Sequence, residues 1–291
     1  MSSVLHWFFQ LTQSDTSIAI DPLMITPRTG VSISASFNSA PCSLRLNHDT
    51  SLYSILQVIR EARVLTLNIR QCFGLYLGIQ TSLSATYILS LIVSEHVFDT
   101  YQLGYLLWFV GPILALSLLF TPHGSTIMTH MPVKKPNVAK DVGRFSIYYI
   151  ARFILIPTSI TTLVFVQLDG GVGSREFSML VFVVYHVVIS ATFQSRYSVL
   201  ERQPYLNRMW IGAATFTTLT TLLWLLIVLY TQEEEPSELG RFRVHLTAWI
   251  PLLGLVGVQE LVKKHDLKNW TQFQKRAHLE FNTKLGMHSP L

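Results

Sequence analysis

Long apolar runs separated by short polar and charged stretches dominate the pattern of hydrophobic and polar positions along this 291-residue chain. A helix needs roughly 20 predominantly apolar residues to cross a bilayer. Six windows come close to or meet this length, and we predict them as membrane helices: residues 73–93, 103–120, 145–166, 177–193, 210–230 and 244–262. The only acidic residue within them is Glu260. The pattern therefore predicts an all-α polytopic membrane protein whose membrane domain covers residues 73–262.

A helical pattern also leads into the first window without a break. Between residues 51 and 72 no Gly or Pro interrupts the chain, and the basic residues stand off a mostly apolar stripe. The stripe comprises Ile55, Ile59, Ala62, Thr66, Ile69 and Phe73, and the basic residues are Arg60, Arg63 and Arg70. Two interpretations are open: an amphipathic helix on an anionic membrane surface, or a rigid stalk that couples a cytosolic domain to the membrane.

Residues 1–50 show a different pattern. Short runs of β-branched and apolar residues, bounded by Asp, Gly or Pro, occur at 13–23 and 30–46. Such runs are typical of strands. We interpret residues 1–50 as a piece of a cytosolic α/β domain that is too small to form a core by itself.

Composition and charge support a membrane protein. Only 13% of the residues are charged, against about 25% in soluble domains. Of the 22 Lys and Arg residues, 19 belong to one side of the membrane: 18 lie in segments that would share that side, and Arg152 lies near a helix entrance on it. The other three are Arg175, Arg241 and Arg243. Because Lys and Arg gather on the cytosolic side, both termini, including the tail 263–291, are predicted to be cytosolic. This distribution accounts for the positive net charge of the chain, so we do not expect nucleic acid as a partner.

Three segments carry a family resemblance. They are "SDTSIAI" at 14–20, "SAPCSLRLNHDTSLYSIL" at 39–56 and "REARVLTLNIRQC" at 60–72. In this order they resemble the exit of P-type cation ATPases from their phosphorylation domain into the fifth of ten membrane helices. The resemblance implies that residues 1–50 are a remnant of that domain, that 51–72 is the stalk, and that the six windows are the last six helices.

A narrower resemblance rests on "SDTSIAIDPL", "PILALSLLFTPHGSTIMTH" at 112–130 and the terminal "QKRAHLEFNTKLGMHSPL" at 274–291. These segments resemble the transmembrane protein 94 family, P-type-ATPase-like proteins of the endoplasmic reticulum linked to magnesium. The resemblance implies an endoplasmic reticulum membrane, magnesium or another cation as the transported ion, and a full-length relative as a partner.

The catalytic motifs of P-type ATPases are not found in this sequence. Those enzymes form an aspartyl phosphate at an Asp-Lys-Thr-Gly-Thr motif, and no Asp here is followed by Lys. Gly-Asp-Gly, Thr-Gly-Glu and a Walker lysine loop are also absent from the sequence. We expect no autonomous ATPase activity, no catalytic residue and no cofactor on this chain.

The candidates for an ion path are neutral. Gln80, Ser84 and Tyr87 share one helical face, and the Gly111-Pro112 pair interrupts the second window. A proline within a span frees carbonyls that can line a cation path. The alternative is a packing kink with hydrogen bonds between helices, and the residues alone favour it. For Arg152 we favour snorkelling to the headgroups over a place in an ion path.

Three functions remain in view. The first is the carboxy-terminal membrane half of a P-type-ATPase-like cation transporter, as a fragment or a short isoform. The second is a non-enzymatic membrane subunit or scaffold that binds a full-length relative or another partner. The third, a small independent carrier or channel, would be expected to show an inverted repeat or charges within its spans, and the sequence shows neither of these patterns.

Overall fold

In the computed structural model, the described residues are 18–20, 44–46, 53–93, 97–122, 127–128, 143, 146–168, 174–195, 197–198, 204–231 and 238–287. They fall into two compact units, Met1–Ala62 and Arg63–Leu291. In the first unit, β1 (Ile18–Ile20) and β2 (Leu44–Leu46) pair in parallel, with Ile18 opposite Leu44. Each short strand lies within one of the two segments predicted to form strands. The phosphorylation-domain remnant stays a prediction, since most of residues 1–50 lie outside the described part.

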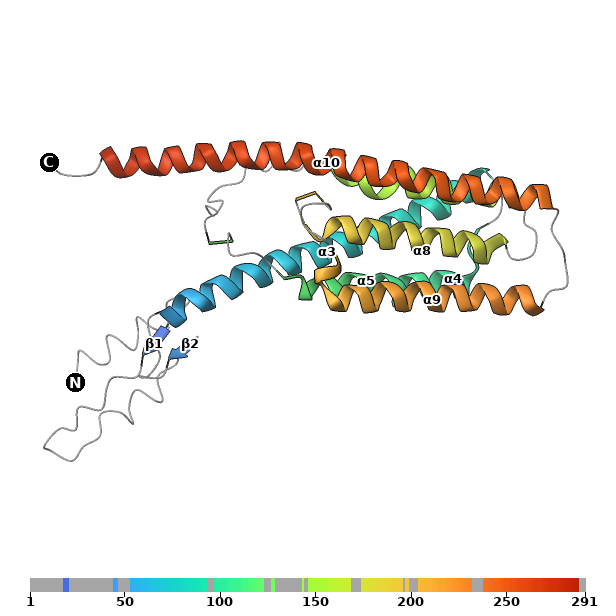
Figure 1. Ribbon diagram of the computed structural model, residues 1–291, viewed down its shortest axis with the longest axis horizontal. Helices are drawn as coiled ribbons and strands as arrows, with labels where there is room; N and C mark the ends of the chain where they lie inside the picture. The colour runs from blue at the N-terminus through green and yellow to red at the C-terminus, as the bar shows by residue number, and fades with distance from the viewer. Residues whose placement is uncertain are drawn as a thin grey trace, which may run out of the picture. The chain divides into compact units, whose positions relative to one another are not determined.

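The helices are shown in Figure 1, with bounds as follows: α3 (Tyr53–Val93), α4 (Thr100–Tyr105), η1 (Leu106–Val110), α5 (Gly111–Ser117), η2 (Leu118–Phe120), η4 (Ile150–Leu155), α7 (Ile156–Leu168), α8 (Ser174–Phe193), η5 (Pro204–Leu206), α9 (Arg208–Thr231) and α10 (Glu238–Met287). Six stretches of the described helices are long and apolar enough to cross a membrane. The prediction of six membrane-length helices is confirmed, and the chain is a multi-pass membrane protein.

The α3 helix runs without interruption from Tyr53 to Val93, as expected from a segment without Gly or Pro before Gly74. The stripe at its start is not covered by other described residues, since Ile59, Ile69 and Phe73 are exposed. Whether this half of α3 is a cytosolic stalk stays a prediction.

Within the second unit, α8 has the largest buried share of the six membrane-length helices and packs against α7, α9 and α10 (Figure 1). Its core side chains include Met179, Phe182 and Ile189, none of which is exposed. A helix that is apolar on all sides is stable only where other helices or lipid surround it. In α8 other helices provide most of these surroundings.

The inward face of α3 carries a small residue every fourth position. These residues are Gly74, Gly78, Ser82, Thr86 and Ser90. Small side chains at this spacing let membrane helices approach closely. Gly78 lies against the ring of Phe153 in η4, and Ser90 and Thr162 of α7 are hydrogen-bonded at 3.4 Å. These small residues therefore position α3 along the third span.

Candidate functional site

The second span changes helical register immediately before Pro112. Residues 106–110 form a π-helical segment, in which the Gly111 N–H bonds to the Leu106 carbonyl, five residues back. The next N–H in this register would come from Pro112, which has none. The Leu107 carbonyl therefore has no backbone donor in its own helix. Single π-helical turns of this kind are frequent at functional sites.

Gln80 of α3 donates to this carbonyl. Its Nε2 lies 3.4 Å from the Leu107 oxygen, a long hydrogen bond. Gly111 allows this approach, because a Cβ at position 111 would lie 3.0 Å from the same Nε2 atom. The structure thus connects Gln80 with the Gly111-Pro112 break, two features that the sequence singled out separately.

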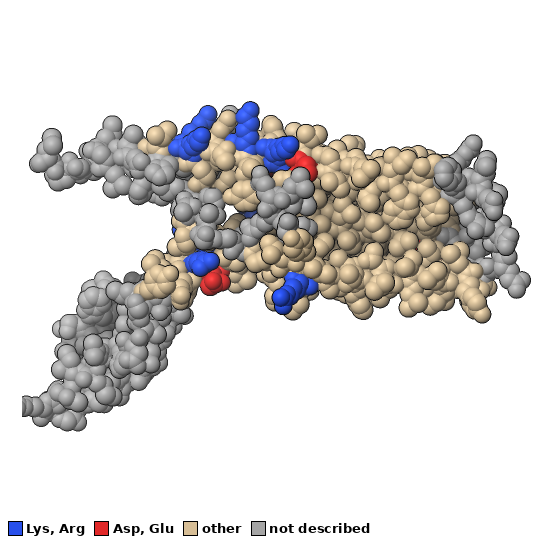
Figure 2. Space-filling model, viewed as in Figure 1, with Lys and Arg blue, Asp and Glu red and all other residues tan. Residues whose placement is uncertain are grey.

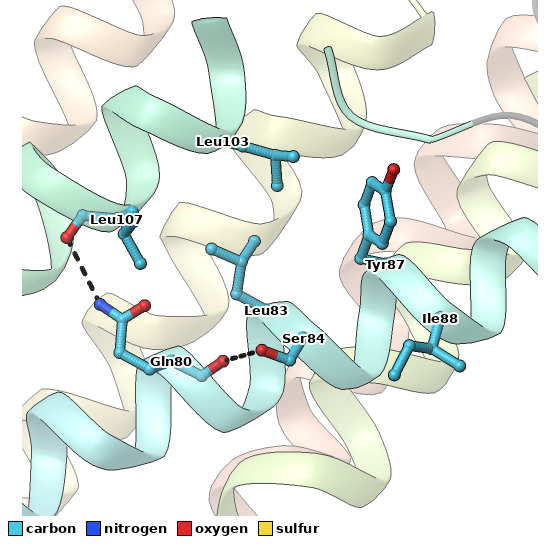
Figure 3. A pocket seen from close by; sticks show the side chains of 7 residues that line it. All are labelled: Gln80, Leu83, Ser84, Tyr87, Ile88, Leu103 and Leu107. Carbon is cyan, nitrogen blue, oxygen red and sulfur yellow. Dashed lines mark hydrogen bonds between the residues drawn. The ribbon is translucent and has the colours of Figure 1, made fainter. Parts of the chain in front are cut away.

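A pocket of about 370 Å³ lies beside this contact, between α3 and the α4–η1 segment (Figure 3). Its lining consists of Gln80, Leu83, Ser84, Tyr87, Ile88, Leu103 and Leu107. The three polar α3 residues predicted to share a face therefore line one pocket. Because Ser84 is exposed and Ile88 is 58% exposed, the pocket opens on the outer surface of these helices.

The polar side chains of the pocket are all neutral, and each carries an oxygen atom. The Gln80 Oε1 atom is buried and has no hydrogen-bond partner. The Ser84 hydroxyl donates to the Gln80 backbone carbonyl at 3.0 Å, which leaves its own oxygen able to accept or coordinate. No acidic side chain lines this pocket, and the described residues contain no cluster of three or more His, Cys, Asp or Glu that could hold a metal. Any cation here would bind to amide, hydroxyl and carbonyl oxygens.

A second break of the same kind occurs in the third span. The π-helical η4 precedes Pro157, and the Arg152 carbonyl, five residues before it, accepts from Gln259 Nε2 of α10 at 3.0 Å. The Arg152 Nε atom donates to Gln259 Oε1 at 2.8 Å. Both ends of this amide are therefore occupied, and Gln259 is fully buried. The two breaks therefore differ. Both ends of the Gln259 amide form hydrogen bonds between two helices, whereas the Gln80 oxygen has no hydrogen-bond partner and lies beside a pocket.

The structure gives Arg152 partners within the protein, which the snorkelling interpretation did not include, and snorkelling itself stays a prediction. The Arg152 guanidinium bonds to Gln259 and lies over the ring of Phe193, 5.4 Å from the centroid. Glu260 and Lys263, on the same stretch of α10, form an ion pair at 3.3 Å. The sequence could not show this, because Gln259 is 107 residues from Arg152.

Sequence reasoning also missed a polar junction at one end of the membrane helices. Asn68 of α3 is buried and donates to the Leu119 carbonyl at 2.8 Å and to the Thr121 carbonyl at 3.1 Å. Asn207, just before α9, donates to the Ser117 carbonyl at 2.9 Å. The available signal was an Asn in the helical stretch that leads into the first membrane window. The junction ties α3 to the end of the second span and to the start of α9.

The three arginines proposed as coupling residues lie elsewhere on α3. Arg60 and Arg70 are exposed, Arg63 is half-buried, and none of them lines the pocket. Their role in coupling therefore stays a prediction.

No protein-family model matches the chain. Two curated relatives do match it: transmembrane protein 94 of Mus musculus and of Homo sapiens, each 27% identical over 349 aligned positions that cover 96% of this chain. The similarity therefore extends over nearly the whole chain. This chain spans about a quarter of the length of these relatives, 25% in both cases.

Proposed function

We propose that this chain, which is similar to transmembrane protein 94 over nearly its whole length, is the carboxy-terminal membrane half of a P-type-ATPase-like cation transporter. The observation that carries the proposal is the buried Gln80 oxygen without a hydrogen-bond partner, beside a pocket and a proline break. On this account α3 and the α4–η1 segment form one wall of the cation path. The sequence has no phosphorylation motif, so ATP hydrolysis would require a catalytic part outside these 291 residues.

Magnesium fits the chemistry of the pocket. This ion binds oxygen and usually keeps several of its waters, so it does not require a cage of carboxylates. Six waters at about 30 Å³ each occupy roughly 180 Å³, and the pocket has about 370 Å³. Gln80, Ser84 and Tyr87 would contact the ion through its waters. The resemblance of the sequence to magnesium-linked proteins of the endoplasmic reticulum supports the same ion and the same membrane.

A non-enzymatic membrane subunit is the second candidate, because the sequence lacks the phosphorylation motif. The size of the native polypeptide separates the two functions. An antibody against residues 274–291 should detect a protein about four times as long as this chain, given that the chain spans 25% of its relatives. Denaturing electrophoresis of native membranes is the measurement. A single species of about the 33.1 kDa of this chain would favour the subunit and contradict the membrane half.

The proposal includes a topology with both termini in the cytosol. Reporter tags fused to each end of the chain should be digested when protease is added outside sealed endoplasmic reticulum vesicles. The expectation rests on the cytosolic preference of Lys and Arg. A lumenal marker protein is the control for sealed vesicles, and protection of both tags would reverse the topology.

A further inference from the structure

The carboxy-terminal half of α10 carries exposed basic side chains. In Figure 2 the Lys and Arg atoms of α10 lie over this half, beside one acidic patch, whereas the bundle surface farther along the helix is drawn in tan, the colour of uncharged residues. Between Leu261 and Arg276 the exposed charged side chains are Lys264, Lys268, Lys275 and Arg276, whereas the two acidic residues in or beside this stretch, Glu260 and Asp266, are half-buried. Basic charge therefore predominates on this surface.

Three lysines of this helix differ in their surroundings. Lys263 is 3% exposed, pairs with Glu260 and donates to the Tyr197 carbonyl at 3.2 Å. Lys264 and Lys268 point away from the bundle and form no ion pair with any described residue. The inner lysine is thus neutralised within the protein, and the outer two are not.

Lys264 and Lys268 follow the lipid-facing side of α10. Ile250, Leu253 and Leu261 are 60%, 79% and 67% exposed, and the helical repeat places the two lysines on the same side of the helix. At 1.5 Å per residue, Lys264 lies about 4 Å and Lys268 about 10 Å beyond Leu261 along the axis. The headgroup layer begins where the hydrocarbon ends and is roughly 5–8 Å thick. Lys264 therefore lies within this layer and Lys268 just past it. Because long helical side chains point back toward the helix N-terminus, both ammonium groups reach the phosphate level of one leaflet.

The spacing of the two lysines would suit an anion. Side chains four residues apart on a helix are neighbours, and two like charges at this spacing repel each other weakly, a cost that an anion between them would remove. The cytosolic leaflet, which this end of α10 is predicted to face, carries anionic phospholipids that attract Lys and Arg. Charge, depth and spacing agree on the same ligand.

We propose that Lys264 and Lys268 form a binding site for the headgroup of an anionic phospholipid. The site holds this end of α10 at the membrane surface, beside the buried contact between Gln259 and Arg152. This inference does not depend on the transport function, since it concerns a different part of the chain from the Gln80 pocket.

Lipid binding to the purified full chain tests the site. The chain is placed in nanodiscs of phosphatidylcholine that contain a minority of phosphatidylserine, and bound lipids are counted by native mass spectrometry after release. Lys264→Gln with Lys268→Gln should weaken the retention of phosphatidylserine about 30-fold, since each lysine near the surface contributes roughly a fivefold factor. High salt should weaken it in the unaltered chain.

Lys275 and Arg276 provide a matched control on the same helix. They lie about 20 Å or more beyond Leu261 at 1.5 Å per residue, past the headgroup layer. Lys275→Gln with Arg276→Gln removes the same charge and should leave phosphatidylserine retention unchanged, and Lys264→Arg with Lys268→Arg should preserve it. Equal loss in both pairs would show a general effect of charge, and unchanged retention in the Lys264 and Lys268 pair would point to an acidic protein surface as the ligand. Either result overturns the proposal.

Discussion

Gly78→Ala should destabilise the helix bundle by about 1–3 kcal/mol, the usual cost of adding a methyl group to a filled core. A Cβ at position 78 would lie 2.5 Å from two atoms of the Phe153 ring. The ring has little room to move, because Phe153 is 1% exposed and packs against Tyr149 and Phe193. The loss should appear as a lower midpoint in thermal unfolding of the detergent-solubilised chain, followed by tryptophan fluorescence.

Gly212→Ala is the control for this prediction. Nothing lies within 4 Å of a Cβ at position 212, and alanine is a better helix former than glycine by about 1 kcal/mol. This change should leave the midpoint unchanged or raise it. Phe153→Leu should partly rescue Gly78→Ala, since it removes the ring that the new methyl group meets. If both glycine changes gave the same midpoint, the close approach of α3 and η4 would be wrong.

Leu65→Pro should abolish cation transport by the complete transporter that contains this chain. The substitution removes one backbone hydrogen bond of α3 and places the ring against the Glu61 carbonyl, at a cost of about 3 kcal/mol or more. Leu65 is 53% exposed, so the change breaks the helix without removing a buried contact. Position 68 is less suitable, because Asn68 itself ties α3 to the second span. Cation uptake by sealed vesicles is the measurement.

Two controls separate the stalk from a helix that only lies on the membrane surface. Leu65→Ala keeps the backbone hydrogen bond and should transport normally, and Arg63→Gln should have a mild effect of about 1 kcal/mol or less. On the surface-helix interpretation the outcomes differ. Normal transport by Leu65→Pro, together with release of the segment from the membrane when Arg60, Arg63 and Arg70 are replaced, would reject the stalk.

Local patterns predicted the parts of the structure that depend on neighbouring residues. Apolar runs of membrane length predicted six helices, because a helix in lipid must satisfy its backbone internally. The spacing of Gln80, Ser84 and Tyr87 predicted a shared helical face, and the structure places all three at one pocket. Whether a cation passes there stays a prediction.

Contacts between distant segments could not be predicted in the same way. The partners of Arg152 and Asn68 come from other helices, and no local rule selects Gln259 or the Thr121 carbonyl for them. The prolines were a usable signal that was followed only in part. Pro112 was recognised as a break, whereas Pro157, which ends a π-helical segment in the same way, was not.

Magnesium uptake by sealed vesicles that contain the complete transporter tests the central claim most directly. If the Gln80 oxygen contacts the ion or its waters, Gln80→Leu should reduce uptake about 10- to 100-fold, since a hydrogen bond to a charged group contributes roughly 1.5–3 kcal/mol. Gln167→Leu is the matched control, because Gln167 is exposed, bonds to Thr247 and does not line the pocket, and its uptake should match the unaltered protein. Uptake that is unchanged by Gln80→Leu, or an unaltered protein that moves no more magnesium than protein-free vesicles, would contradict the account.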